Sequence, residues 1–114
     1  MSQVRLTAAV EAAGLVRRAQ ANGDFAAILR KGDLERGALL LVIRSRDRHV
    51  ACLERRLVPD GSYQWEEAGP IGSTEPKQVA EFLDNRVRFD EDLWLIELDI
   101  AQPERFIAET TSTG

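Results

Sequence analysis

The densest group of side chains that could carry chemistry is acidic and lies between residues 90 and 99. It comprises Asp90, Glu91, Asp92, Glu97 and Asp99. Carboxylates can bind a hard cation, but these do not follow the spacing of a calcium-binding loop and lack its central glycine. At a helix-to-strand junction, Asp90 and Asp92 are instead predicted to accept hydrogen bonds from backbone amides. We therefore expect no metal ion and no cofactor.

The chain has one histidine and one cysteine, His49 and Cys52, which is too few for a Cys/His zinc site. Because they are three residues apart, their side chains would point to opposite faces of a regular strand, which argues against a catalytic Cys–His pair. Cys52 is predicted to be a small core residue, and His49 an exposed or edge residue beside a turn. With no catalytic residue in view, the sequence favours a protein that is not an enzyme.

Arginines form a second pattern at one end of a predicted strand and in the strand after it. They are Arg44, Arg46, Arg48, Arg55 and Arg56. If the two groups met across a hairpin, the basic edge could contact phosphates. The pI of about 5.0 and the intervening Asp47 and Glu54 favour a solvated hairpin with cross-strand ion pairs. Nucleic acid is not an expected partner, but Arg44, Arg46 and Arg48 stay candidate binding residues.

Two further candidates are Trp65 and Glu97. Trp65 and Trp94 both lie in apolar strand patterns, where tryptophan usually belongs to the core, although an exposed one would anchor a partner. Glu97 alternates with Leu93 and Leu95, and a carboxylate buried on that face needs a partner, for which an arginine is the best candidate.

The elements that position these residues follow from periodicity and turn signals. Helical spacing of Leu6, Ala9, Val10, Ala13 and Val16 predicts a helix over 4–21, ended by Asn22-Gly23. A second helix is expected from a cap at Thr74 to about residue 89. Strands are predicted over 25–30, 38–46, 49–57, 62–68 and 93–100, with a short return over 103–107.

Alternation assigns the faces of the two most apolar strands. Leu39, Leu41 and Ile43 share one face, and Leu40 and Val42 the other. In the last strand, Trp94 shares a face with Ile96, Leu98 and Ile100. We predict an α+β fold in which an N-terminal helix, a four-stranded antiparallel meander and a second helix are followed by a final strand that joins the sheet. Residues 1–109 form one domain, and 110–114 a frayed tail.

Composition narrows the setting. A chain of 114 residues with 44% apolar and 30% charged residues suits one globular domain. A single cysteine favours a reducing, cytoplasmic location, and no secretory signal is evident. The longest apolar run, 38–43, is too short to cross a bilayer, so no membrane association is expected.

Charge is unevenly distributed. Residues 1–56 carry eleven basic and six acidic side chains, a net charge of +5, whereas residues 57–114 carry four and thirteen, a net charge of −9. The simpler interpretation is that the two halves lie against each other and partly neutralise. The alternative is a two-sided surface that binds an acidic partner or another copy head to tail.

One block is specific enough to suggest relatives: 88–98, Arg-Phe-Asp-Glu-Asp-Leu-Trp-Leu-Ile-Glu-Leu. With 15–18 (Leu-Val-Arg-Arg), 30–33 (Arg-Lys-Gly-Asp), 37–40 (Gly-Ala-Leu-Leu) and the isolated Trp65, it resembles the bacterial family known as domain of unknown function 1491. The likeness covers about 5–107. It implies a small α+β domain in the bacterial cytoplasm, and it implies no activity.

The leading expectation is therefore a non-enzymatic protein-interaction module or homo-oligomer. The first alternative is a small-ligand-binding domain or enzyme whose site exists only in three dimensions, where Arg44 and Arg46 meet the acidic end segment. The second is weak nucleic-acid binding through the basic hairpin.

Overall fold

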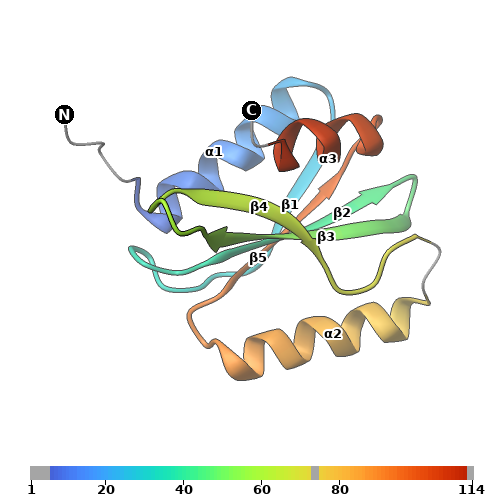
Figure 1. Ribbon diagram of the computed structural model, residues 1–114. Coiled ribbons are helices and arrows are strands. Elements are labelled where there is room, and N and C mark those ends of the chain that lie inside the picture. The colour runs from blue at the N-terminus through green and yellow to red at the C-terminus, as the bar shows by residue number, and fades with distance from the viewer. Residues whose placement is uncertain (1–5, 73–74, 113–114) are drawn as a thin grey trace.

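The protein folds as a mixed five-stranded sheet between two layers of helices. The computed structural model describes residues 6–72 and 75–112, apart from the side chain of Leu57. Its elements are α1 (Ala8–Ala21), β1 (Phe25–Arg30), β2 (Leu39–Ser45), β3 (Arg48–Leu57), β4 (Tyr63–Ala68), α2 (Pro76–Phe89), β5 (Trp94–Asp99) and α3 (Pro103–Thr111). Helices α1 and α3 lie on one face of the sheet and α2 lies on the other (Figure 1). The α+β class and the five strands are confirmed, each strand within one residue of its predicted ends.

The strand order β1-β5-β2-β3-β4 corrects the predicted meander. Only β2, β3 and β4 follow one another as antiparallel neighbours. The last strand, β5, separates β1 from β2, pairing antiparallel with β1 and parallel with β2. Because β5 is apolar on both faces over its first half, it gains most from a central position covered on both sides. The sheet is consequently mixed.

Strand alternation divides the apolar side chains into two cores, as predicted. The core beneath α1 and α3 contains alternate residues of β2 and of the segment that includes β5. They are Leu39, Leu41 and Ile43, and Trp94, Ile96, Leu98 and Ile100. Leu40, Val42, Cys52, Leu93 and Leu95 form the core beneath α2. Trp94 is buried and its Nε1 donates to the carbonyl of Asp33 at 2.7 Å, so this tryptophan is a core residue.

Helix α1 starts later and faces differently from the prediction. Thr7 caps it by accepting a hydrogen bond from the amide of Val10 at 3.3 Å. Its buried residues are Ala8, Ala12 and Ala19. Of the predicted stripe, Ala9 and Val16 pack partly buried against the core, whereas Leu6 and Val10 are exposed. The residues that pack closest to the sheet are alanines, because small side chains allow the helix to approach it.

Helix α2 presents its apolar side chains to the sheet: Phe82, Leu83 and Val87 pack against the core beneath it. The predicted cap, Thr74, lies outside the described residues. Glu75 occupies the N-cap position, and its side chain makes no capping hydrogen bond.

The segment predicted as a short return strand over 103–107 is the start of α3. Pro103 occupies the first turn, where its missing amide costs no helical hydrogen bond. Phe106 and Ile107 then pack onto the core. Thr110 and Thr111, expected in the tail, belong to this helix.

The β2–β3 hairpin turns through two residues with left-handed backbones, Arg46 (φ 53°) and Asp47 (φ 64°). The carboxylate of Asp99 accepts hydrogen bonds from both of their amides, at 3.2 and 3.3 Å. Beyond the turn, Ile43 pairs with Ala51 and Arg44 with His49, so Val50 is an extra residue in β3. Because of this β-bulge, the side chains of residues before Val50 face the side of the sheet opposite to the one that regular alternation predicts.

None of the helices formed by residues 6–72 and 75–112 is long and apolar enough to span a membrane.

Candidate functional site

A pocket of about 420 Å³ opens between the sheet and the N-terminal half of α2. We call it the α2 pocket. Its apolar wall comes from Leu29, Val42, Pro76, Val79, Ala80 and Leu83, and its polar wall from Arg44, Asp47, Arg48, His49 and Glu97. An apolar cavity with a few converging polar groups is the usual form of a small-molecule site.

Arg44 reaches the pocket from the end of β2. Its guanidinium donates from Nη2 to the carbonyl of Asp47 at 2.6 Å, which ties the side chain to the hairpin turn. Its Nε is buried without a hydrogen-bond partner. A buried donor left unpaired costs about 1–3 kcal/mol, so such groups in a folded protein need an explanation.

His49 was predicted to be an exposed or edge residue, and the structure makes it half-buried in the lining of the α2 pocket. Its Nε2 lies 2.7 Å from the carbonyl oxygen of Pro70, and because a carbonyl only accepts, Nε2 carries the proton of this bond. The Nδ1 atom is buried and has no partner. The bulge at Val50 brings His49 to the α2 side of the sheet, the same side as Cys52, so the predicted opposition of these two side chains is wrong.

Glu97 enters the pocket from β5, between Ala27 and Val42 in the sheet register. Its side chain is half-buried. In the part of the chain that the structure describes, it forms no ion pair, and neither Arg44 nor Arg48 pairs with any carboxylate. The charges that line this pocket therefore share a cavity without neutralising one another directly.

The structure thus gathers three of the five predicted binding residues: Arg44, Arg48 and Glu97. Arg46 lies in the turn outside the pocket lining. Arg55 and Arg56 do not join them, because they lie near the far end of β3. Arg55 pairs with Glu11 at 2.5 Å and Arg56 with Glu66 at 3.8 Å. The predicted basic hairpin is therefore not one continuous patch.

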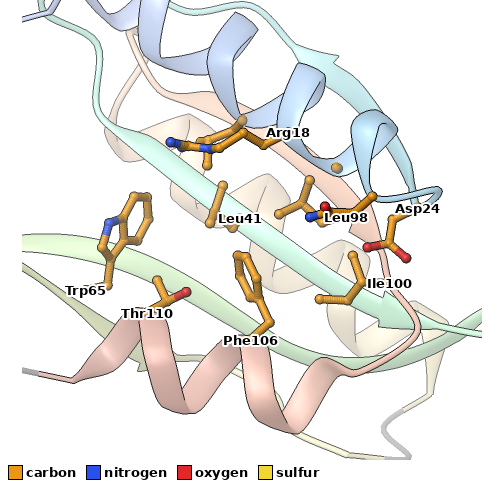
Figure 2. Close-up of a pocket in the computed structure, with 11 residues that line it drawn as sticks. Arg18, Asp24, Leu41, Trp65, Leu98, Ile100, Phe106 and Thr110 are labelled. Carbon is orange, nitrogen blue, oxygen red and sulfur yellow. The ribbon is translucent and has the colours of Figure 1, made fainter.

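Trp65, the fifth candidate, borders a separate cleft of about 290 Å³ between α1 and α3. Figure 2 shows its indole standing beside Leu41 and Phe106, with the guanidinium of Arg18 extending over the cleft. The guanidinium carbon of Arg55 stacks 5.3 Å from the Trp65 ring centre. Trp65 is partly buried against the core, so its contacts within the chain account for it as a packing residue.

Catalytic chemistry gains no support from the remaining candidates. Burial raises the pKa of the Cys52 thiol to about 12, with a smaller contribution from the charge of Glu54, so at neutral pH it is a protonated core side chain and not a nucleophile. Residues 6–72 and 75–112 contain no group of three or more Cys, His, Asp or Glu side chains placed to hold a metal ion.

Sequence reasoning missed His49 and the contribution of α2. The bulge that redirects His49 leaves no mark in the residue pattern. Val79, Ala80 and Leu83 of α2 pack over the sheet and also line the pocket. The sequence did hold one indication of this site. Arg44 and Glu97 each continue an alternating row of apolar residues, so each is placed on the α2 face of its strand.

The architecture defines the class: a small three-layer α+β domain with a mixed five-stranded sheet. Residues 6–108 match the family model described as a protein of unknown function (DUF1491), so the chain belongs to the DUF1491 family. This confirms the resemblance found in the sequence.

Solved structures agree with this assignment. A crystal structure of a DUF1491 family protein from Caulobacter crescentus CB15 is similar with a TM-score of 0.74 and 29% identity, covering 84% of this chain and 89% of the other. An NMR structure of a family protein from the same bacterium gives a TM-score of 0.72 and 28% identity, with coverage of 85% and 87%. The solution structure of Atu0922 from A. tumefaciens gives 0.65 and 27%, with coverage of 86% and 88%. No curated protein matches the chain.

Proposed function

We propose that the protein binds a small zwitterion with an apolar side chain, of the amino-acid type, in the α2 pocket. One observation carries the proposal: Glu97, Arg44 and Arg48 line the same cavity without forming an ion pair. A carboxylate and guanidinium groups that line one cavity without pairing directly can each pair with the opposite charge of a zwitterion.

An amino acid supplies the bridge. Its carboxylate would pair with the arginines, which favour planar carboxylates, and its ammonium group with Glu97. Its side chain would lie against Val42, Val79 and Leu83. The Nδ1 atom of His49, when neutral, accepts a further hydrogen bond from the ligand.

The test is titration calorimetry with L-leucine and two matched analogues. 4-Methylpentanoate lacks the ammonium group, and 3-methylbutylamine lacks the carboxylate. Leucine should bind and both analogues should bind at least about tenfold more weakly, because each leaves a charge of the pocket unpaired.

Variants locate the site. Arg48→Gln and Glu97→Gln should each weaken leucine binding about tenfold. Arg46→Gln removes the same charge from the same hairpin, but outside the pocket, and should leave the affinity unchanged. Absence of heat with leucine and with other apolar amino acids, or equal effects of Arg46→Gln and Arg48→Gln, would refute the proposal.

This role is binding without chemistry, in keeping with the sequence-based expectation of a protein that is not an enzyme. A cytoplasmic location stays a prediction from the single cysteine. The predicted protein-interaction role is taken up below.

A further inference from the structure

The two edges of the sheet differ in how well they are protected from pairing with another strand. β1 and β4 are the edge strands. β4 carries Glu66 and Glu67, so two copies joined along this edge would bring like charges together. β1 has no charged residue before Arg30. Edge strands in natural proteins usually carry charges, prolines, β-bulges or covering elements. β1 has a bulge between Ile28 and Arg30, but its regular part, Phe25–Ile28, is apolar and can pair with another strand.

Three large apolar side chains on β1 face solvent. Phe25 is 58% exposed, Leu29 is 49% exposed and Ile28 is 39% exposed. The β1 ladder engages only one side of the strand, through its pairing with β5. Both the main chain and the side chains of β1 are therefore available for a partner.

We propose that two copies of this chain pair along β1, antiparallel and across a two-fold axis, and that Phe25 of each copy completes the α2 pocket of the other. The pairing makes one continuous sheet from the two five-stranded sheets. Completion of the pocket by Phe25 rests on the ligand-binding function proposed above, whereas the pairing along β1 does not.

The order of residues along β1 suits such a pair. With Ala27 of one copy opposite Ala27 of the other, Phe25 of each copy lies next to Leu29 of the other, the extra residue of the bulge between Ile28 and Arg30. At the strand ends, Asp24 accepts a hydrogen bond from the amide of Ala101, and Arg30 donates to the carbonyls of Lys31 and Glu91. These charges are thus held within each copy, and the contact between the copies is apolar.

Phe25 and Leu29 also lie on the same side of the sheet as the α2 pocket. Ala26 belongs to the core beneath α1 and α3, so its neighbours Phe25 and Ala27 point to the α2 side of the sheet. Leu29 lines the α2 pocket. Phe25 of the second copy, opposite Leu29 on the same face, therefore extends the outer wall of the pocket, where a single copy ends at the sheet edge.

Self-association is tested by light scattering coupled to gel filtration, from low micromolar to near-millimolar protein. The unmodified chain should reach the mass of two copies as concentration rises. Phe25→Lys should keep the mass of one copy, because it places two lysines beside an apolar pair. Phe89→Lys is the matched control, since Phe89 is 88% exposed at the end of α2, and it should associate like the unmodified chain.

Hydrogen exchange supplies a second measurement that does not depend on a variant. Amides of β1 should exchange more slowly at high protein concentration, while those of β4 should not change. A single-copy mass for the unmodified chain up to near-millimolar concentration, or equal association of the Phe25→Lys and Phe89→Lys variants, would overturn the proposal.

Leucine titration separates the two proposals. Phe25→Lys should bind leucine about tenfold more weakly than Phe89→Lys. If both variants bind leucine equally, completion of the pocket is refuted while the ligand-binding function stands. If the chain pairs along β1 but no apolar amino acid binds, the ligand-binding function fails and the pairing stands.

Discussion

Arg46 and Asp47 adopt a backbone conformation that is costly for residues with side chains. Their φ angles of 53° and 64° lie in the left-handed region, where an L-residue other than glycine loses roughly 1–2 kcal/mol. Three hydrogen bonds hold them there: two from their amides to Asp99, and one from Arg44 to the carbonyl of Asp47. The turn that fixes Arg44 at the pocket is thus maintained by side chains from two strands.

Replacing Asp47 by glycine should stabilise the protein. Glycine relieves the left-handed backbone and keeps the amide and carbonyl that bind Asp99 and Arg44, with a part of the gain offset by the freer unfolded chain. We expect urea denaturation to show an increase of about 0.5–1 kcal/mol in the free energy of unfolding. Asp47→Ala removes the same charge but keeps the Cβ atom, so an equal increase in that variant would show that charge, not backbone, is responsible.

Cys52 should make stability fall in alkaline solution. Its pKa rises from 9.0 to about 12 on folding, so above pH 9 the unfolded chain loses the thiol proton that the folded chain retains. Ionisation then favours the unfolded state, and stability is lost as pH rises from 9 towards 12. Between pH 8 and pH 10 the free energy of unfolding should drop by about 1.4 kcal/mol more in the native sequence than in Cys52→Ala. Parallel pH curves for the two proteins would contradict this.

At the scale of the elements, local patterns predicted where the strands lie and which residues share a face. They did not predict which strands pair with one another. Alternation in β2 and β5 is set by the pleat, so Leu41 and Ile96 could be assigned to one core from sequence alone. Nothing local distinguishes a β1–β2 neighbour from a β1–β5 neighbour, because that choice is decided by contacts between distant segments. The α3 segment was mistaken for a strand because Phe106 and Ile107 are too few to define a helical period.

For the candidate site, too, local alternation was predictable from the sequence and irregular backbone was not. Glu97 was predicted to need an arginine, and the structure places Arg44 and Arg48 in its pocket, although not in an ion pair. Parity within the strand placed Glu97 on the correct face, whereas its pairing with an arginine stays a prediction. His49 was missed because a one-residue bulge at Val50 redirects its side chain, and Arg46 was retained because alternation was extended into a turn where it does not hold.

The loop between β1 and β2 packs closely against residues 92 and 93, which lead into β5. A Cβ atom on Gly32 would collide with the carbonyl of Asp92 and with the backbone of Leu93. Gly32→Ala should therefore lower the free energy of unfolding by about 2–3 kcal/mol, since backbone atoms cannot move aside cheaply. Gly14→Ala provides the contrast: nothing lies near its added methyl group, and a helical alanine should raise stability by about 0.5–1 kcal/mol. Thermal or urea denaturation of both variants gives the comparison.

For the whole molecule, the interleaved strand order ties the two halves of the chain together. β5, from the acidic half, lies between β1 and β2, from the basic half. Arg56 of β3 also forms an ion pair with Glu66 of β4 at 3.8 Å. The two halves thus lie against each other in the sheet, and their partial neutralisation stays a prediction.

A fragment of residues 1–72 should consequently not fold. It contains four of the five strands, but β1 has no neighbour without β5, and both cores lose their central strand. We expect its circular dichroism spectrum to lack the sheet signal and to show no cooperative melting, and we expect an equimolar mixture with residues 73–114 to regain both. Cooperative melting of the fragment alone would show that β2, β3 and β4 suffice.

The position of β5 also sets a condition on biosynthesis. A ribosome makes about 5–20 residues per second, and about 70 residues separate the end of β1 from the end of β5, so β1 emerges roughly 3–14 s before its only partner in the sheet. Throughout that interval the apolar segment Phe25–Leu29 is available to any other strand, including the same segment of a neighbouring nascent chain. Slower translation between codons 31 and 99 should therefore lengthen the exposure of this segment, and chaperones that shield it should raise the share of chains that reach the native sheet.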